Sequence, residues 1–157
     1  MLISGKVKEP SSFKKLAADC DISTSVQDVY KILYTVASET CVWSFQYKIL
    51  NRILFTNAKL FKIGLKESEK WSSCNTHKED LFHLFFNCSY AQEFWKSFIA
   101  WWYGLSGESL NLGLKSIIVG IVDRVDVLNY LIILGKLCIW ECRKIKGYLI
   151  LGCFRKR

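Results

Sequence analysis

Apolar side chains recur every three or four positions along much of the chain, which is the spacing of one helical face. The first such run covers residues 26–38. It follows Ser25, which with Asp28 three positions later resembles a helix-capping arrangement. A second run at 41–54 again places its apolar residues on one side. Both runs predict amphipathic helices.

A third, shorter helix is predicted to begin after Thr56 or Asn57, whose side chains can accept a hydrogen bond from the first helical turn. It ends near Gly64, because glycine readily adopts the left-handed conformation found after a helix C-terminus. The polar, turn-rich residues 65–78 that follow form the clearest loop of the sequence.

The helical pattern resumes after this loop. A short helix is predicted at 79–87, and Ser89 with Gln92 has the spacing of a capping box at the start of a longer one. A final helix at about 126–146 is apolar on most sides, which predicts a central, buried position. The longer helix carries a stripe of aromatic residues that we expect in the core: Phe94, Trp95, Phe98, Trp101 and Trp102.

Residues 114–122 are rich in β-branched side chains and fit either a helix or a short strand near 115–122. The other segments predict an all-α fold, a small multi-helix domain with one knuckle-like loop. We expect residues 1–24, which contain the only proline, to be a flexible lead-in. Residues 25–157 are then a single helical domain, ending in a basic helix and tail at 126–157.

Charge is concentrated at the end of the chain. The 157 residues have a formal net charge of +8, and residues 136–157 contain seven basic side chains and one acidic one. Such a tail attracts phosphate groups of nucleic acid or of anionic lipid, or it is simply a solvated, solubilising end. No uncharged stretch approaches the roughly 20 residues of a bilayer span, and no signal peptide is evident, so we expect an intracellular protein without a membrane segment.

A cluster of metal-binding residue types lies in and after the polar loop. Cys74, His77, His83 and Cys88 fall within 15 residues, a local spacing typical of structural zinc sites. The alternative is two unrelated cysteines with a capping or surface histidine. Phosphate-binding glycine loops, nucleophile elbows and HExxH motifs are absent from the sequence, so we expect no enzymatic activity.

The residues around this cluster are the most specific part of the sequence. HLF at 83–85 precedes Cys88, and a helix bearing Trp95 follows. With the apolar run that begins at Phe45, this pattern over residues 45–102 resembles the zinc-binding region C-terminal to the reverse transcriptase of non-LTR retrotransposons. The resemblance implies zinc as cofactor, with Cys74, His83 and Cys88 among its ligands.

The sequence departs from the family pattern at one position. The pattern has a cysteine three residues before Cys74, where this chain has Trp71. The ligand set is therefore incomplete, and His77, a distant cysteine such as Cys41, or water would have to fill the open position. A degenerate copy of a retroelement would also explain the substitution.

The resemblance implies a role in holding RNA or DNA near the polymerase, alongside other parts of a retroelement polyprotein. The metal-binding Tyr/Phe-x-Asp-Asp motif of the polymerase itself is missing. Trp71 would stack on a base or, alternatively, pack over the loop in place of a metal contact. The rival interpretation is a metal-free helical module for protein interaction or scaffolding. The expected nucleic-acid contacts are Trp71, Lys136, Arg143, Lys144, Lys146, Arg155, Lys156 and Arg157.

Overall fold

The computed structural model describes residues 9–71, 74, 77–124 and 127–143. Within these residues the fold is all-α, as the sequence predicts, and the only β-type pairing is a single antiparallel bridge between Lys70 and Lys78. None of the described helices has both the length and the apolar character needed to cross a membrane. The helical elements are α1 (Ser11–Asp19), α2 (Val26–Val36), α3 (Thr40–Leu50), α4 (Asn57–Lys62), the π-helical turn η1 (His83–Asn87), α5 (Ser89–Ser106), α6 (Leu114–Ile118) and α7 (Val127–Cys142).

Local signals in the sequence fix several of the helix ends. The Ser25 hydroxyl accepts a hydrogen bond from the backbone N–H of Asp28 at the start of α2. The Thr56 hydroxyl does the same for Lys59 at the start of α4, so Thr56 rather than Asn57 is the cap. Helix α5 ends at Gly107, whose φ of 71° is a conformation that glycine adopts without steric strain.

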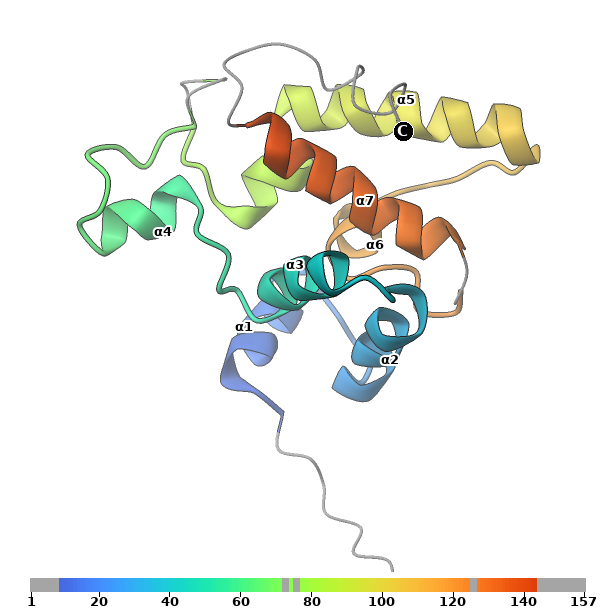
Figure 1. Ribbon diagram of the computed structural model, residues 1–157, viewed down its shortest axis with the longest axis horizontal. Helices are drawn as coiled ribbons and strands as arrows, with labels where there is room; N and C mark the ends of the chain where they lie inside the picture. Colours follow the sequence, from blue (N-terminus) through green and yellow to red (C-terminus); the bar gives the residue numbers. More distant parts are fainter. Residues whose placement is uncertain (1–8, 72–73, 75–76, 125–126, 144–157) are drawn as a thin grey trace, which may run out of the picture.

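Helix α7 lies at the centre of the molecule, with α5 along one side and α3 along the other (Figure 1). It packs on α3, α2, α6 and η1. Helix α4 lies at the edge of the molecule (Figure 1). The central position of α7 agrees with a sequence that is apolar on most sides.

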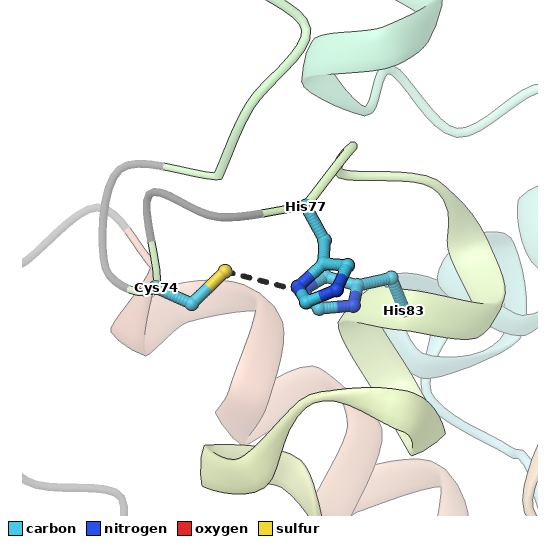
Figure 2. A group of neighbouring side chains, drawn as sticks. All are labelled: Cys74, His77 and His83. Carbon is cyan, nitrogen blue, oxygen red and sulfur yellow. Dashed lines mark hydrogen bonds between the residues drawn. The ribbon is translucent and has the colours of Figure 1, made fainter.

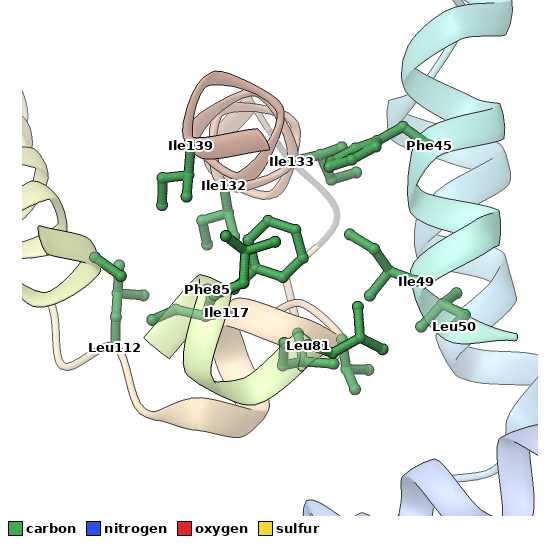
Figure 3. Close-up of a cluster of buried hydrophobic side chains, with 14 of the residues drawn as sticks. Phe45, Ile49, Leu50, Leu81, Phe85, Leu112, Ile117, Ile132, Ile133 and Ile139 are labelled. Carbon is green, nitrogen blue, oxygen red and sulfur yellow. The ribbon is translucent and has the colours of Figure 1, made fainter. Parts of the chain in front are cut away.

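The hydrophobic core lies between α7, α3, η1 and α6. Figure 3 shows the ring of Phe85 from η1 among isoleucines of α7 and α6, on the side that faces α3. Phe85 also meets Phe45 of α3 edge to face, with ring centroids 6.1 Å apart. The phenylalanine of the HLF motif therefore anchors the candidate metal-binding segment in the core.

Helix α1 lies within the segment for which we expected a flexible lead-in. Phe13 and Leu16 are fully buried in the main core, and α1 packs on α3. Asp19 at its end forms an ion pair with Arg52. The expectation of a flexible 1–24 is therefore wrong for residues 11–19. The helix is short and its apolar face is narrow, so the lysines between the apolar residues make the helical pattern hard to recognise in the sequence.

The alternative of a strand near 115–122 is also corrected. Residues 114–118 form α6, in which Ile117 and Ile118 are fully buried. The backbone leaves the helical region at Gly120, where φ is 109°. A strand needs a neighbouring strand for its hydrogen bonds, and the described part of the chain has none to offer.

Candidate metal centre

The loop after α4 returns on itself before it reaches η1. The bridge between Lys70 and Lys78 closes its base, and the backbone N–H of Trp71 donates to the carbonyl of His77 at 3.2 Å. Cys74 lies between these paired segments. The closed loop brings Cys74 and His77 to the same end of the molecule as η1.

The π-helical turn sets the spacing of His83 and Cys88. Asp80 caps the turn, its Oδ1 accepting a hydrogen bond from the backbone N–H of His83 at 2.9 Å. The N–H of Cys88 donates to the carbonyl of His83 at 3.0 Å. A bond between residues five apart belongs to a π turn, which is wider than an α turn and frequent at functional sites.

Three potential ligands converge at this place (Figure 2). The Cys74 sulfur and ring nitrogens of His77 and His83 all lie within 4.8 Å of one another. Cys74 Sγ is 3.2 Å from His83 Nε2, and the two imidazole centroids are 5.2 Å apart. His83 is buried, Cys74 is half-buried and His77 is exposed, so the group lies where the core meets solvent.

Cys88 borders the same group from the protein interior. Its side chain is 2% exposed, and burial raises the pKa of its thiol. The charge of Cys74 and a hydrogen bond with Cys74 raise that pKa further, so the two sulfurs are neighbours. Cys88 is nevertheless outside the three-residue group whose atoms come closest together.

The environment of His83 favours its neutral form. Burial lowers the pKa of its imidazole, and the nearby His77 lowers it further, while Asp80 acts in the opposite direction. A neutral imidazole is the form that coordinates a metal ion.

These residues fit zinc. Tetrahedral zinc sites use thiolate and imidazole ligands, which the bond lengths place about 3.3 to 3.8 Å from one another. The Cys74–His83 separation of 3.2 Å is already close to this range. The chain thus has a candidate zinc site with an incomplete ligand set, in which His77 stands closest to Cys74 and His83. Cys41, exposed on α3, is not in the group among the described residues.

Trp71 forms a wall of this site. Its side chain is 3% exposed and meets His83 and Tyr90 edge to face, at centroid distances of 6.0 and 5.9 Å. Its buried indole N–H has no hydrogen-bond partner in the described structure. This position leaves no ring face open to a base, so the expectation of base stacking is corrected in favour of packing over the loop.

Glu79 holds the metal loop against the start of α4 and against Arg143 beyond α7, a role that the sequence did not indicate. It is 1% exposed, and its Oε1 accepts hydrogen bonds from the backbone N–H of Asn57 at 2.9 Å and from Arg143 Nη1 at 2.6 Å. Burial raises the pKa of Glu79, while the Asn57 bond and the Arg143 charge lower it. The only feature of the sequence that could have pointed to this role is the position of Glu79 shortly before the HLF motif.

Two of the expected phosphate-binding residues are engaged inside the fold. Lys136 is 0% exposed, and its Nζ donates to the carbonyl of Ile118 at 3.1 Å and to Gln46 Oε1. It cannot reach a phosphate, because the apolar run around it places it in the core. Arg143 pairs with Glu79, and its guanidinium lies 3.6 Å from the ring centroid of Trp140. Lys144, Lys146, Arg155, Lys156 and Arg157 lie outside the described residues.

The chain was compared with curated proteins and with models of protein families. No curated protein matches the chain, whereas one family model does. The family model described as zinc-binding in reverse transcriptase matches residues 11–95, which is more than half of the 157 residues. The match includes α1 and α2 and ends in α5, so it covers the whole candidate metal centre. The chain belongs to the family of zinc-binding regions associated with reverse transcriptases.

Proposed function

We propose that the chain is a non-catalytic accessory module that binds nucleic acid beside a reverse transcriptase of the non-LTR retrotransposon type. The convergence of Cys74, His77 and His83 carries this proposal, because these side chains could hold zinc in a family member that lacks the first cysteine expected from the resemblance. Zinc bound there would join the loop to η1 and stabilise the fold.

A structural role fits the surroundings of the site better than a catalytic one. Cys88 borders the group from the interior and is available as a further protein ligand, in addition to Cys74, His77 and His83. Trp71 and Tyr90 wall the site with aromatic rings. Closed sites with four protein ligands are structural, whereas catalytic zinc sites keep one position for water or substrate.

Charge supports nucleic acid as the partner. The net charge of +8 favours polyanions through counterion release and long-range attraction. Lys144, Lys146, Arg155, Lys156 and Arg157 would add phosphate contacts that do not depend on base sequence.

The test is binding of labelled RNA, single-stranded DNA and duplex DNA of equal length, measured by fluorescence anisotropy over a series of salt concentrations. We expect binding at low salt that weakens steeply as salt rises. Absence of binding to all three probes by the folded, zinc-loaded chain would overturn the proposal.

A metal-free helical scaffold is the second candidate function. It is favoured by the packing of Trp71 against His83, which covers part of the site with an aromatic ring. It predicts a fully folded chain that takes up no zinc and binds no nucleic acid.

A further inference from the structure

The edge of the molecule next to the metal loop carries exposed aromatic rings between lysines. Phe55 is 55% exposed and Phe61 is 46% exposed, and both lie on or beside α4. We define the α4 surface by these two rings and four neighbours with exposed or half-exposed side chains: Lys59, Lys62, Ile63 and Leu65. Helix α4, from which they project or beside which they lie, is at the edge of the molecule (Figure 1).

The chain segment that forms this region is basic, and the carboxylate closest to α4, that of the buried Glu79, is paired with Arg143. Residues 40–66 contain five basic side chains and no aspartate or glutamate. Arg52 pairs with Asp19, but within the described structure neither Lys59 nor Lys62 has a carboxylate partner. An exposed apolar patch with uncompensated positive charge complements a ligand with apolar faces and a negative backbone.

One lysine of this surface is already oriented. Lys59 Nζ donates to the carbonyl of Arg52 at 3.1 Å and lies 5.3 Å from the ring centroid of Phe55. The ammonium group therefore lies over one face of the Phe55 ring, and the ring as a whole remains 55% exposed. This is the combination with which proteins bind single-stranded nucleic acid, the ring stacking on a base and the cation meeting the phosphates.

The metal loop holds α4 in place. The side-chain amide of Asn57 donates to the carbonyl of Lys70 at 2.9 Å, and the backbone N–H of Ala58 donates to the carbonyl of Glu79 at 3.2 Å. The loop that carries Cys74 and His77 thus also orients the α4 surface.

We propose that the α4 surface binds single-stranded nucleic acid, with Phe55 and Phe61 stacking on bases and Lys59 and Lys62 contacting phosphates. This inference rests on the proposed function and assigns it a place and a ligand class. A duplex is a poor fit, because its bases are stacked on each other and offer no free face to the two rings. RNA and single-stranded DNA share the chemistry that the surface recognises.

The test compares the full chain with the double variant Phe55→Ala/Phe61→Ala, using labelled 12-nucleotide oligo(U), oligo(dT) and a 12-base-pair DNA duplex. The aromatic substitutions leave the charge unchanged, so they separate stacking from the attraction of the basic tail. We expect the affinity for the single strands to fall about fivefold to a hundredfold, with little change for the duplex. The ratio of the oligo(U) and oligo(dT) affinities shows which source the surface prefers.

A second double variant, Lys59→Ala/Lys62→Ala, tests the interaction with phosphates. It should make the dependence of log K on log salt less steep, by about 0.7 for each phosphate that the variant no longer neutralises. The matched control is Tyr103→Ala/Lys96→Ala on α5, where an exposed aromatic residue and an exposed lysine lie away from α4. Thermal unfolding of each variant checks that it folds.

Each outcome has one meaning. Binding by the wild type and the control that is weakened in both α4 variants supports the α4 surface. Equal binding by all folded variants overturns the α4 surface and leaves the proposed function standing. Absence of binding by the wild type overturns both.

Discussion

Trp71 occupies the position at which the family pattern has its first cysteine, and it defines the chemistry of the site at the scale of single residues. The ring is buried against His83 and carries an indole N–H without a partner in the described structure. A buried donor without an acceptor is unfavourable by about 1 to 3 kcal/mol. The chain therefore combines a candidate zinc site with an aromatic wall where the resemblance to the family leads us to expect a thiolate.

Trp71→Cys is predicted to strengthen zinc binding and to weaken the metal-free fold. The new thiolate restores the missing ligand, while loss of the buried ring removes packing worth up to about 5 kcal/mol. Competition with a chromophoric chelator measures the affinity, and thermal unfolding with and without chelator measures stability. Trp71→Phe is the control, because it keeps an aromatic ring and supplies no ligand. Equal zinc affinity in Trp71→Cys and the wild type would contradict the assignment of this position.

Lys136 makes stability depend on pH. Burial lowers the pKa of its ammonium group from 10.5 to about 7, so the folded chain binds fewer protons than the unfolded chain between these values. The free energy of unfolding therefore rises as the pH rises from about 7 towards 10.5, because Lys136 can be buried in its neutral form. Below about pH 7 the folded chain bears the full cost of burying the charged ammonium group.

Lys136→Met is predicted to stabilise the protein at pH 6 by a few kcal/mol, on the order of the free energy that the pKa shift represents. The Gln46 amide still donates to the carbonyl of Ile118 at 2.9 Å, so this carbonyl keeps a partner in the variant. Urea unfolding of both proteins at several pH values measures the difference, which should shrink as the pH approaches 10. A difference that stays constant with pH would contradict this account.

At the scale of elements, η1 sets the register of His83 and Cys88. These two residues are five positions apart, and the π turn joins them by one backbone hydrogen bond. An α-helical turn would place residues four apart in that relation. The wider turn is therefore what allows both side chains to approach the loop that carries Cys74.

Deletion of Asn87, an exposed residue of η1, is predicted to abolish this register. The remaining residues would close an α turn, Cys88 would move away from Cys74, and zinc affinity should fall by more than about tenfold. Asn87→Ala keeps the turn and should bind zinc like the wild type. Similar zinc affinities in the deletion and in Asn87→Ala would rule out a role for the π turn.

The elements that could be predicted from the sequence are those with a clear apolar period, such as α2 and α3. Helix α1 was missed because only Phe13 and Leu16 mark its buried side. Lys136 was misplaced because a charge within an apolar run resembles a helix emerging into solvent, whereas here it is satisfied by Gln46 and Ile118.

The residue types and their spacing predicted the candidate metal site, but they did not predict the contacts that surround it. Spacing placed Cys74, His77, His83 and Cys88 together, and the structure brings ligand atoms of the first three within 4.8 Å of one another. The burial of Glu79 could not be predicted, because it depends on Arg143, 64 positions further along the chain. A local sequence pattern does not indicate a contact between residues so far apart along the chain.

At the scale of the whole molecule, the metal loop connects separate parts of the fold. Glu79 joins it to Arg143 beyond the end of α7 and to the first residue of α4, Asn57. Zinc binding is therefore expected to stabilise more than the loop. A site saturated at about a hundredfold above its Kd adds about 3 kcal/mol, which is a rise in Tm of about 5 to 10 °C for a domain of this size.

Differential scanning calorimetry with added zinc and with a chelator measures this rise. Arg143→Ala should lower the Tm in both conditions, since it leaves the buried Glu79 without its cationic partner. In a chain that elemental analysis shows to contain zinc, a Tm that does not respond to zinc removal would show that the loop is uncoupled from the rest of the fold.

We expect the loop to bind zinc although Trp71 replaces a ligand, and the zinc content of the protein tests this without an indirect readout. Elemental analysis of the purified, reduced chain should find about one zinc per chain. Cys88→Ser and His77→Ala should each lose most of it if both side chains complete the site with Cys74 and His83. A folded wild-type chain without zinc would contradict the account and make the metal-free helical scaffold the better description.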